Sequence, residues 1–340
     1  MAERDDSDEL DEAVDALMTD TPFHLDPRLA DLLRIAGELR DLPSDEWKAR
    51  LGAALASAAR AATGGRVLAS PDDITIRLDE IANESHLLAY DPHRALADLP
   101  ESTMRFFTAM DGCTIGVSRF STNSHWERHP AGDELLHLLE GDAEITVLTD
   151  DGPTRTTAHA GSLFVCPKGL WHQIRPLSPV SLLFATPGEG IEHAPADDPR
   201  LGDTRADVPP LPAHHLPTLL SDLPSVAISA KTTRAEADAA VRTLTWLDDK
   251  HLVGVMRFSG LTPWERHPDG DELLHALDSA IDVTVLADDG PVVVHVPSGG
   301  VFVCPRGLWH RQLPRDTVTE LFLTPAKTSQ VSFADDPRRQ

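Results

Sequence analysis

The sequence predicts a mainly β protein in which two tandem β-sandwiches or β-barrels follow a helical segment. Three observations predict this fold class. Residues 113–187 superimpose without a gap on residues 251–325, 138 positions later, and about half of the aligned pairs are identical. Each copy contains short alternating or β-branched runs that are separated by turn residues, as in sandwiches and barrels. Apolar residues at helical spacing are concentrated before residue 66.

The N-terminal part divides into an acidic tail and a predicted helical hairpin. Residues 1–22 contain nine acidic residues and one arginine, so we expect this tail to be solvated and flexible. Residues 23–66 contain two apolar runs at helical spacing, and Ser44 is suited to cap the second helix. We expect the hairpin to pack on the rest of the protein or across a dimer, with partner binding as the alternative.

The rest of the chain is expected to contain a β-domain at 67–190, a linker at 191–224, a second β-domain at 225–330 and a tail at 331–340. In the first copy the predicted strands are GVSRF, LLHLL, EITVL, LFVCP and SLLFA. The linker is rich in Pro and Asp, so it cannot form a continuous helix or a central strand. A short helix is expected at residues 233–241.

Composition restricts the partners. The formal net charge of −25 opposes binding to nucleic-acid phosphates and to anionic membranes, so we expect neither. No apolar run approaches the roughly 18 residues that a membrane-spanning helix needs. Three cysteines without zinc-ribbon spacing, and an N-terminus without signal-peptide features, indicate a cytoplasmic protein. Scarce lysine with abundant Ala, Arg, Asp and Pro suggests a bacterial source, and a homodimer through sheet edges is a further possibility.

Two motifs in each copy bring ionisable residues together. The stretch WERHPAGDELLHLLEG contains Glu127, His129 and Glu134, and residues two apart share one face of a strand. A second motif, G-x5-P-x-G-x2-H, ends at His172, and its glycines and proline suit a tight connection that returns a strand beside the first motif. Burying these groups would be costly without a cation, so their convergence predicts a divalent metal site.

At these residues the chain resembles a known superfamily. The spacing His129-x4-Glu134-x6-Gly141, followed by the second motif, is similar to the two cupin motifs, and the duplication resembles a bicupin. The resemblance spans roughly residues 100–190 and 238–328, and it implies two tandem cupin-type β-barrels of the double-stranded β-helix or jelly-roll kind. It also implies metal ligands at His129, Glu134 and His172 in the first copy and at His267, Glu272 and His310 in the second.

The chain departs from the cupin pattern at Glu127 and Glu265, which replace the first histidine of motif one. As fourth ligands, our preferred interpretation, they complete a sphere suited to Fe(II), Mn(II), Zn(II) or Ni(II). As non-ligands they leave the two-histidine, one-carboxylate face expected of non-haem iron oxygenases, and they become candidate catalytic bases. A third alternative is that Glu127 pairs with Arg128 or Arg119 and has neither role.

Several neighbouring residues receive structural interpretations. Ser279 replaces Gly141 in the second copy, so we expect weaker metal binding there. The tryptophans of the motifs could wall a pocket but are expected to pack, and the cysteines before the turn prolines are expected to be buried, inert thiols. His137 and His275 point away from the predicted ligands, so a structural role is expected for both. His159 and His295 do not align with each other, so neither is a good candidate for a ligand that both copies require. The tryptophans are Trp126, Trp171, Trp264 and Trp309, and the cysteines are Cys166 and Cys304.

The resemblance leaves three functional classes open. The first is a metal-dependent bicupin enzyme that acts on a small polar metabolite, namely a non-haem iron oxygenase of the dioxygenase type, an oxidoreductase with Fe(II) as cofactor. The second is a non-redox Zn or Mn enzyme, such as an isomerase, lyase, hydrolase or bond-forming biosynthetic enzyme. The third is a metal- or ligand-binding regulatory protein without catalysis.

Overall fold

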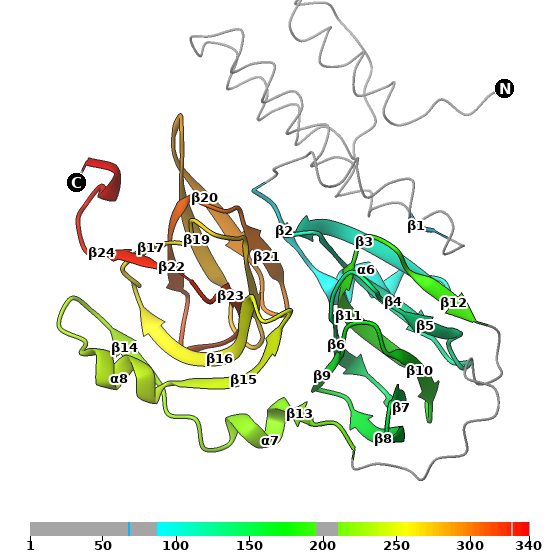
Figure 1. Cartoon of the computed structure of the whole chain (residues 1–340). Coiled ribbons are helices and arrows are strands. Elements are labelled where there is room, and N and C mark those ends of the chain that lie inside the picture. Colours follow the sequence, from blue (N-terminus) through cyan, green and yellow to red (C-terminus); the bar gives the residue numbers. More distant parts are fainter. Residues whose placement is uncertain (1–66, 69–86, 195–209, 328, 340) are drawn as a thin grey trace, which may run out of the picture. The chain divides into compact units, whose positions relative to one another are not determined.

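The computed structural model describes residues 67–68, 87–194, 210–327 and 329–339, which belong to one compact unit spanning residues 66–340. These residues form two β-sandwiches in tandem, as the repeat predicted (Figure 1). The acidic tail and the predicted helical hairpin lie outside the described residues. Within the described part of the chain, no helix is long and apolar enough to cross a membrane.

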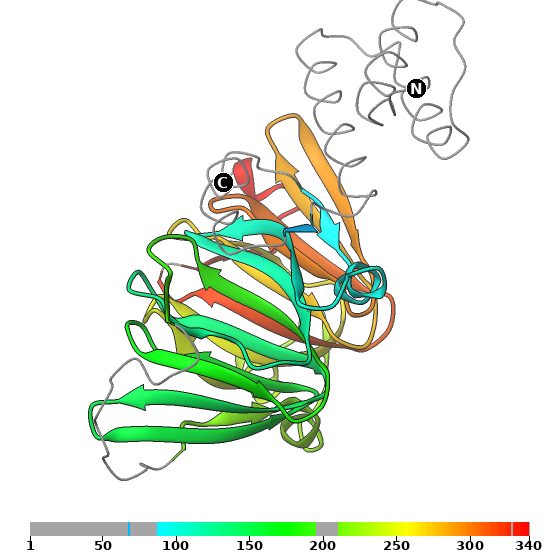
Figure 2. The same cartoon turned by 90° about the vertical axis from the view of Figure 1, so that its right-hand side faces the viewer.

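The first sandwich consists of two sheets with the strand orders β1-β3-β4-β11-β6-β9-β13 and β12-β5-β10-β7-β8. Figure 2 shows this sandwich, coloured mainly cyan to green, turned to face the viewer. Its core lies between them, where Leu136 and Phe184 of one sheet pack with Ile145 and Ile174 of the other. The five predicted strands are confirmed as β4, β6, β7, β9 and β11. The strands are β1 Val67–Leu68, β3 Thr103–Met110, β4 Cys113–Phe120, β5 Trp126–Arg128, β6 Glu134–Glu140, β7 Asp142–Thr149, β8 Gly152–His159, β9 Ser162–Cys166, β10 Trp171–Pro176, β11 Val180–Pro187, β12 Glu192–Ala194 and β13 Ala213–His215.

The second sandwich repeats this arrangement. Its sheets have the orders β14-β16-β23-β18-β21-β2 and β20-β19-β22-β17-β24, and β15 also pairs with β16. Phe258 and Phe302 pack with Val283 and Val285 in its core. The strands are β14 Val226–Ile228, β15 Val241–Leu247, β16 His251–Gly260, β17 Trp264–Arg266, β18 Glu272–Ala276, β19 Ile281–Ala287, β20 Gly290–Val296, β21 Val301–Cys304, β22 Trp309–Pro314, β23 Val318–Pro325 and β24 Gln330–Ser332, followed by the 3-10 helix η1 Pro337–Arg339.

Short helices accompany the segments before each sandwich. Helix α6 spans Pro92–Ala97 and helix α7 spans Leu216–Leu220, and both have proline in the first turn, where a missing N–H is tolerated. Helix α8, Arg234–Ala239, confirms the helix predicted at 233–241. Its first turn is capped reciprocally, because the Thr233 hydroxyl accepts from the Glu236 N–H while the Glu236 carboxylate accepts from the Thr233 N–H.

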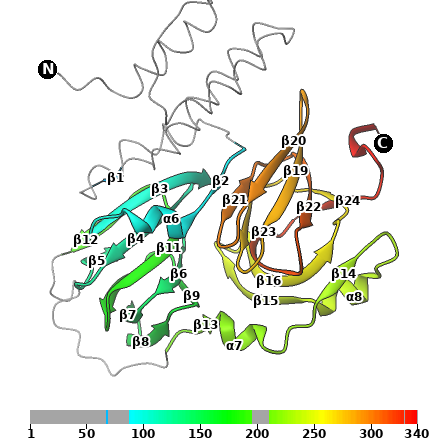
Figure 3. The same ribbon diagram turned by 180° about the vertical axis from the view of Figure 1, so that it is seen from behind.

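The two sandwiches exchange short strands. Strand β2, Ala89–Tyr90, lies between β1 and β3 of the first sandwich in the chain but pairs with β21 of the second. Strand β13 lies in the predicted linker, before the second sandwich, and pairs with β9 of the first (Figure 3). Strands β12 and β13 are both edge strands, as expected for this Pro-rich segment. Sheet pairing therefore connects the expected first domain to the second through β2, and the expected linker to the first domain through β13.

A shared apolar core and a pair of aspartate contacts join the sandwiches. One buried cluster includes Leu135 and Leu183 of the first sandwich and Leu273 and Leu321 of the second. The predicted structural role of His137 and His275 agrees with their position, because both rings are buried and their centroids lie 5.4 Å apart between the sandwiches.

The aspartate contacts are reciprocal and repeat with the duplication. The Asp133 carboxylate accepts from the Asp248 N–H at 2.8 Å, and the Asp248 carboxylate accepts from the Asp133 N–H at 2.7 Å. Asp111 and Asp271 form the equivalent contact, with N···O distances of 3.1 and 2.8 Å. Each contact therefore holds a residue that directly precedes a predicted metal-binding glutamate, Glu134 or Glu272.

Candidate metal centre

Four side chains of the first copy converge where the two motifs meet. Glu127 lies on β5, His129 follows β5 directly, Glu134 begins β6 and His172 lies on β10. Strand β10 pairs with β5 so that His172 stands opposite Glu127. The Gly169 N–H donates to the His129 carbonyl at 3.0 Å, and its φ of +73° favours glycine. The tight connection predicted from the second motif therefore places His172 beside the first motif.

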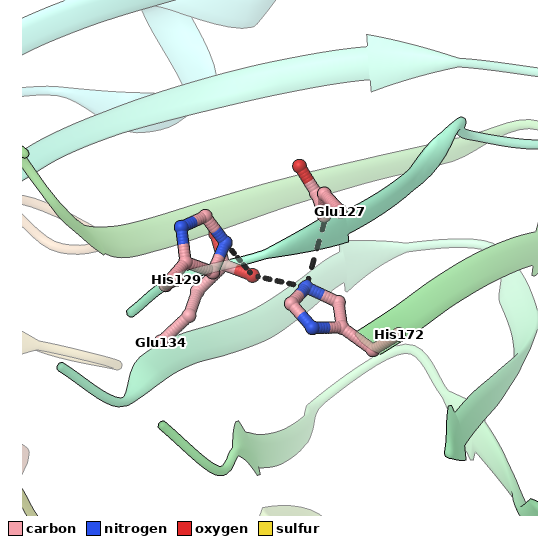
Figure 4. A group of neighbouring side chains, drawn as sticks. All are labelled: Glu127, His129, Glu134 and His172. Atoms are coloured by element: carbon pink, nitrogen blue, oxygen red, sulfur yellow. Dashed lines mark hydrogen bonds and ion pairs between the residues drawn. The ribbon is translucent and has the colours of Figure 1, made fainter. Parts of the chain in front are cut away.

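The donor atoms of these four residues, which we call site 1, have the spacing of metal ligands (Figure 4). Glu134 Oε2 lies 3.0 Å from His172 Nε2 and 3.4 Å from His129 Nε2, and Glu127 Oε1 lies 3.6 Å from His172 Nε2. Two ligands at about 2.1 Å from one ion are about 3.0 Å apart in octahedral geometry and about 3.4 Å apart in tetrahedral geometry. Small side-chain shifts are enough to ligate a divalent ion.

Burial and electrostatics agree with this assignment. The side chains of His129, Glu134 and His172 are at most 6 % exposed, whereas the Glu127 side chain is 22 % exposed. Burial opposes ionisation of Glu134, but the neighbouring His129 and His172 lower its pKa below the usual range. Burial also opposes protonation of His172, yet contacts with Cys166, Glu127 and Glu134 raise its pKa well above the usual value. The cluster is thus built to hold positive charge among its carboxylates, which a divalent ion supplies.

Hydrogen bonds outside the cluster orient two of the donors. The Thr186 hydroxyl donates to Glu134 Oε1, which leaves Oε2 facing the histidines. His172 Nδ1 lies 3.3 Å from the Leu170 carbonyl, an acceptor that places the proton on Nδ1 and leaves the Nε2 lone pair for an ion. Neither ring nitrogen of the buried His129 makes a hydrogen bond, and its Nε2 atom faces Glu134 Oε2 at 3.4 Å. These observations fit a bound divalent metal.

The second copy reproduces the arrangement at Glu265, His267, Glu272 and His310, which we call site 2. Glu272 Oε2 lies 2.8 Å from His310 Nε2 and 3.2 Å from His267 Nε2, and Glu265 Oε1 lies 3.5 Å from His310 Nε2. His267 Nδ1 also contacts the Ser329 hydroxyl at 3.1 Å. Both quartets that the sequence predicted are brought together.

The lost glycine of the second copy changes the turn but not the donor spacing. Gly141 has a φ of +81° and forms the one-residue connection between β6 and β7. In the second copy, β18 ends at Ala276 and β19 begins at Ile281, so the turn that contains Ser279 is longer. The donor distances of site 2 are similar to those of site 1, so this geometry gives no reason for weaker metal binding in the second copy.

The ion-pair alternative for Glu127 is not realised. Arg119 pairs with Glu140 at 3.2 Å, and Arg128 pairs with Glu192 on the neighbouring strand β12. Glu127 instead lies against His172 and lines a cavity beside site 1. The two remaining roles for Glu127, metal ligand and base, are both compatible with this position.

The cysteines and tryptophans of the motifs have packing roles. Cys166 is 1 % exposed, and burial raises the pKa of its thiol to about 11, so the group is a protonated, shielded neighbour of His172. Trp126 and Trp264 are buried. The Arg128 guanidinium lies over the Trp171 ring, with its Cζ atom 4.9 Å from the ring centroid. Arg266 lies over Trp309 at the same distance. None of these tryptophans is among the described residues that line the cavity.

His159 and His295 lie away from both sites. Each exposed imidazole pairs at 2.8 Å with an aspartate of the neighbouring strand, Asp142 and Asp282 respectively. Their exclusion as ligands in the sequence analysis agrees with these positions.

A cavity of about 310 Å³ borders site 1 and is lined by Glu127, His129, Glu134 and Thr186, among other residues. The sequence analysis missed Thr186. The signal was available, because both copies end their last core strand with Thr-Pro, at residues 186–187 and 324–325.

Site 1 lies in a segment of the chain that matches a known protein family. Residues 118–186, which contain all four residues of site 1, match the cupin domain family. The first copy of the repeat therefore contains a cupin domain. The second copy, which carries site 2, forms a second cupin-like unit. No curated protein is significantly similar to the chain in sequence.

Solved structures similar to this cupin include two bacterial oxalate decarboxylases. The Lactobacillus farciminis enzyme in complex with formate is 12 % identical, with a TM-score of 0.48, covering 73 % of this chain and 89 % of that one. A mutant of the Bacillus subtilis enzyme is 13 % identical, with a TM-score of 0.49, covering 74 % and 81 %. A cupin 2 conserved barrel domain protein from Leptotrichia buccalis is 13 % identical, with a TM-score of 0.47, covering 72 % and 99 %.

Proposed function

We propose that this bicupin is a metal-dependent enzyme that converts a small molecule in the cavity beside site 1, and that its reaction is an iron-dependent oxygenation. The observation that carries the proposal is the buried quartet itself. Donor atoms from two histidines and two glutamates lie at metal-ligand spacing, and three of the four residues also line a cavity. A protein that used these groups only for folding would have no need to expose them to a cavity.

The residues have distinct proposed roles. His129, Glu134 and His172 hold the ion, and Thr186 and the Leu170 carbonyl orient the ligands Glu134 and His172. A bound divalent ion supplies Lewis acidity, and iron in addition supplies redox chemistry with dioxygen. The apolar side chains that line the cavity lower the local dielectric constant, which strengthens electrostatic interactions there.

Glu127 separates the iron oxygenase from the second candidate, a non-redox metal enzyme. Its carboxylate is the most exposed of the quartet, and it lies farther from His172 than Glu134 does. A carboxylate that faces the cavity without being held in the buried cluster is suited to take a proton from a substrate. A redox-inactive ion with Glu127 as base would then catalyse an isomerisation, elimination or hydrolysis.

Elemental analysis tests the proposal first. We expect about two divalent ions per chain, with iron as the dominant metal after expression in iron-supplemented medium. His129→Ala and His267→Ala variants are each expected to lose about half of the metal, because each removes one ligand set. Absence of bound metal in all preparations would refute the proposal.

Oxygen uptake and the Glu127→Ala variant then separate the two candidates. An iron oxygenase consumes dioxygen only when a substrate is present. Retention of metal by Glu127→Ala, together with oxygen-independent turnover by a zinc- or manganese-loaded protein, would replace the oxygenase with the non-redox enzyme. The matched control is Glu192→Ala, which removes an exposed carboxylate on the adjacent strand and should leave the metal content unchanged.

A further inference from the structure

The cavity beside site 1 combines a polar metal quartet with an apolar wall. Its volume of about 310 Å³ is near the lower end of the range for small-molecule sites. At roughly 30 Å³ for each water-sized group, it accommodates a ligand of about ten such groups. The wall comes from both sheets of the first sandwich and includes Met104, Phe106, Leu136, Ile174, Leu182 and Phe184.

The wall offers little to a charged ligand. Among the described residues that line the cavity, Arg119 is the one lysine or arginine. Its guanidinium is already engaged, because it donates to the Glu140 carboxylate and to the Ser181 hydroxyl, each at 3.2 Å. An anionic ligand body would therefore lose its hydration without gaining a free lysine or arginine, which is costly. An anionic or polar head is favourable only at the metal.

The second sandwich differs in this wall. Ile174 and Leu182 occupy the positions that correspond, 138 residues later, to Gln312 and Glu320. The sheet register agrees, since Leu182 pairs with Ser118 on β4 and Glu320 pairs with Met256 on β16. Two apolar side chains of the first sandwich are thus replaced by an amide and a carboxyl group in the second.

The polar pair of the second sandwich is buried and only partly satisfied. Glu320 and Gln312 are 3 % and 4 % exposed. The Gln312 amide donates to Glu320 Oε1 at 3.4 Å, while Glu320 Oε2 and Gln312 Oε1 have no hydrogen-bond partner. Burial, with Glu272 and Glu265 nearby, raises the pKa of Glu320 well above its usual value. The duplicated cupin units have therefore kept the same metal-binding residues but have diverged in the residues that surround them.

We propose that site 1 takes a substrate with an uncharged, apolar body about the size of an aromatic ring and an oxygen- or nitrogen-containing head that binds the metal, and that Ile174 and Leu182 select that body. This inference deepens the proposed function and rests on it, because the head needs a bound ion. The sequence analysis predicted a small polar metabolite, whereas this inference predicts a molecule with an apolar body and a polar, metal-binding head. It also distinguishes the two sites, since the equivalent positions of the second sandwich carry the polar side chains of Gln312 and Glu320.

Two hydroxamates test this inference with the same metal-binding head and different bodies. Acetohydroxamate carries a methyl group, and benzohydroxamate carries a phenyl ring. The full chain with His267→Ala, which disables site 2, is loaded with Zn²⁺ and titrated with each compound by calorimetry. We expect benzohydroxamate to bind at least about tenfold more tightly, because burying the ring removes more apolar surface from water.

Exchange of the wall between the sandwiches provides the matched variants. Ile174→Gln with Leu182→Glu, in the same background, is expected to retain Zn²⁺ and acetohydroxamate binding but to lose the preference for the ring. The reciprocal variant, Gln312→Ile with Glu320→Leu in a His129→Ala background, removes a buried unsatisfied pair and is expected to gain that preference at site 2. The reciprocal variant keeps the inference testable if the first one does not fold.

The outcomes separate this inference from the proposed function. Failure of the protein to bind Zn²⁺ would overturn the proposed function and this inference with it. Zn²⁺ binding with equal affinity for the two hydroxamates would overturn the inference alone. A preference that survives Ile174→Gln with Leu182→Glu, or that fails to appear in the reciprocal variant, would refute the role of these two positions.

Discussion

The hydrogen bond between Thr186 and Glu134 allows a sharp test of site 1, because it can be removed with almost no change in shape. Thr186→Val replaces the hydroxyl with a methyl group. Glu134 Oε1 then loses its donor, while Oε2 still faces His172 and His129 at 3.0 and 3.4 Å. The carboxylate keeps its ligand atom but loses the contact that holds its plane.

Two magnitudes follow from this geometry. Loss of a partner that orients a metal ligand lowers metal affinity about 10- to 100-fold, which corresponds to about 1.4–2.8 kcal/mol of binding free energy. A hydrogen bond to a charged acceptor contributes about 1.5–3 kcal/mol, so the free energy of unfolding of the metal-free protein should fall by a similar amount.

The assay is Zn²⁺ titration in competition with a chelator, in a His267→Ala background so that only site 1 is measured. Thr324→Val is the matched control, because residue 324 is the repeat equivalent of Thr186 beside the disabled site 2. The control should bind Zn²⁺ as tightly as its parent. If Thr186→Val also binds with unchanged affinity while remaining folded, Glu134 is not a metal ligand oriented by Thr186, and the reasoning fails.

Three further predictions concern the framework around the sites. Burial lowers the pKa of His137 to about 4, below the unfolded value near 6.5, so its contribution to stability is complete above pH 6.5 and is lost as the pH falls toward 4. When the pH is lowered from about 7.5 to about 4.5, the free energy of unfolding in urea should therefore fall by about 2.5 kcal/mol more in the wild type than in His137→Leu. Equal decreases in the two proteins would contradict this. Asp133→Ala removes the carboxylate that accepts from the N–H groups of Lys168 and Asp248 at 2.7 and 2.8 Å. It should therefore lower the free energy of unfolding by about 2 kcal/mol and weaken Zn²⁺ binding at site 1. The control Asp150→Ala, at an exposed position, should change neither quantity. Gly141→Ala should lower the free energy of unfolding by more than about 2 kcal/mol, because the φ of Gly141 is +81° and a Cβ would lie 2.1 Å from a backbone carbonyl oxygen. Gly112→Ala, with a φ of +85° and no atom within 4 Å of the Cβ, should lower it by about 1 kcal/mol. Equal shifts in melting temperature would refute the steric part of this argument.

The duplicated units of this cupin differ in a way that suggests divided roles. The donor spacing of sites 1 and 2 agrees within a few tenths of an ångström. The wall residues differ instead, with Ile174 and Leu182 in one sandwich and Gln312 and Glu320 in the other. Because both copies have the same candidate metal ligands but different residues beside them, we expect the two sites to bind the same ion and different molecules.

Local pattern was sufficient to predict the strands and the two groups of side chains that converge at sites 1 and 2. The two-residue period of a strand indicated that Glu127 and His129 share a face and that His137 points away from Glu134, and the structure has this arrangement. The gapless repeat then predicted the second quartet from the first, because equal spacing in two copies of one fold places equivalent side chains together. These features depend on residues that are close in the chain or related by the repeat.

Features that depend on pairing between distant segments could not be predicted in this way. Period alone cannot say that Arg119 pairs with Glu140 in place of Glu127, because sheet register brings these residues together. The exchange of β2 and β13 between the sandwiches likewise depends on which edge strands are free to pair. The cavity wall and the buried Glu320 arise where strands of two sheets meet, and their burial follows from packing across the sandwich. The chain's local chemistry thus specifies which groups can bind a metal, and long-range strand pairing specifies what surrounds them.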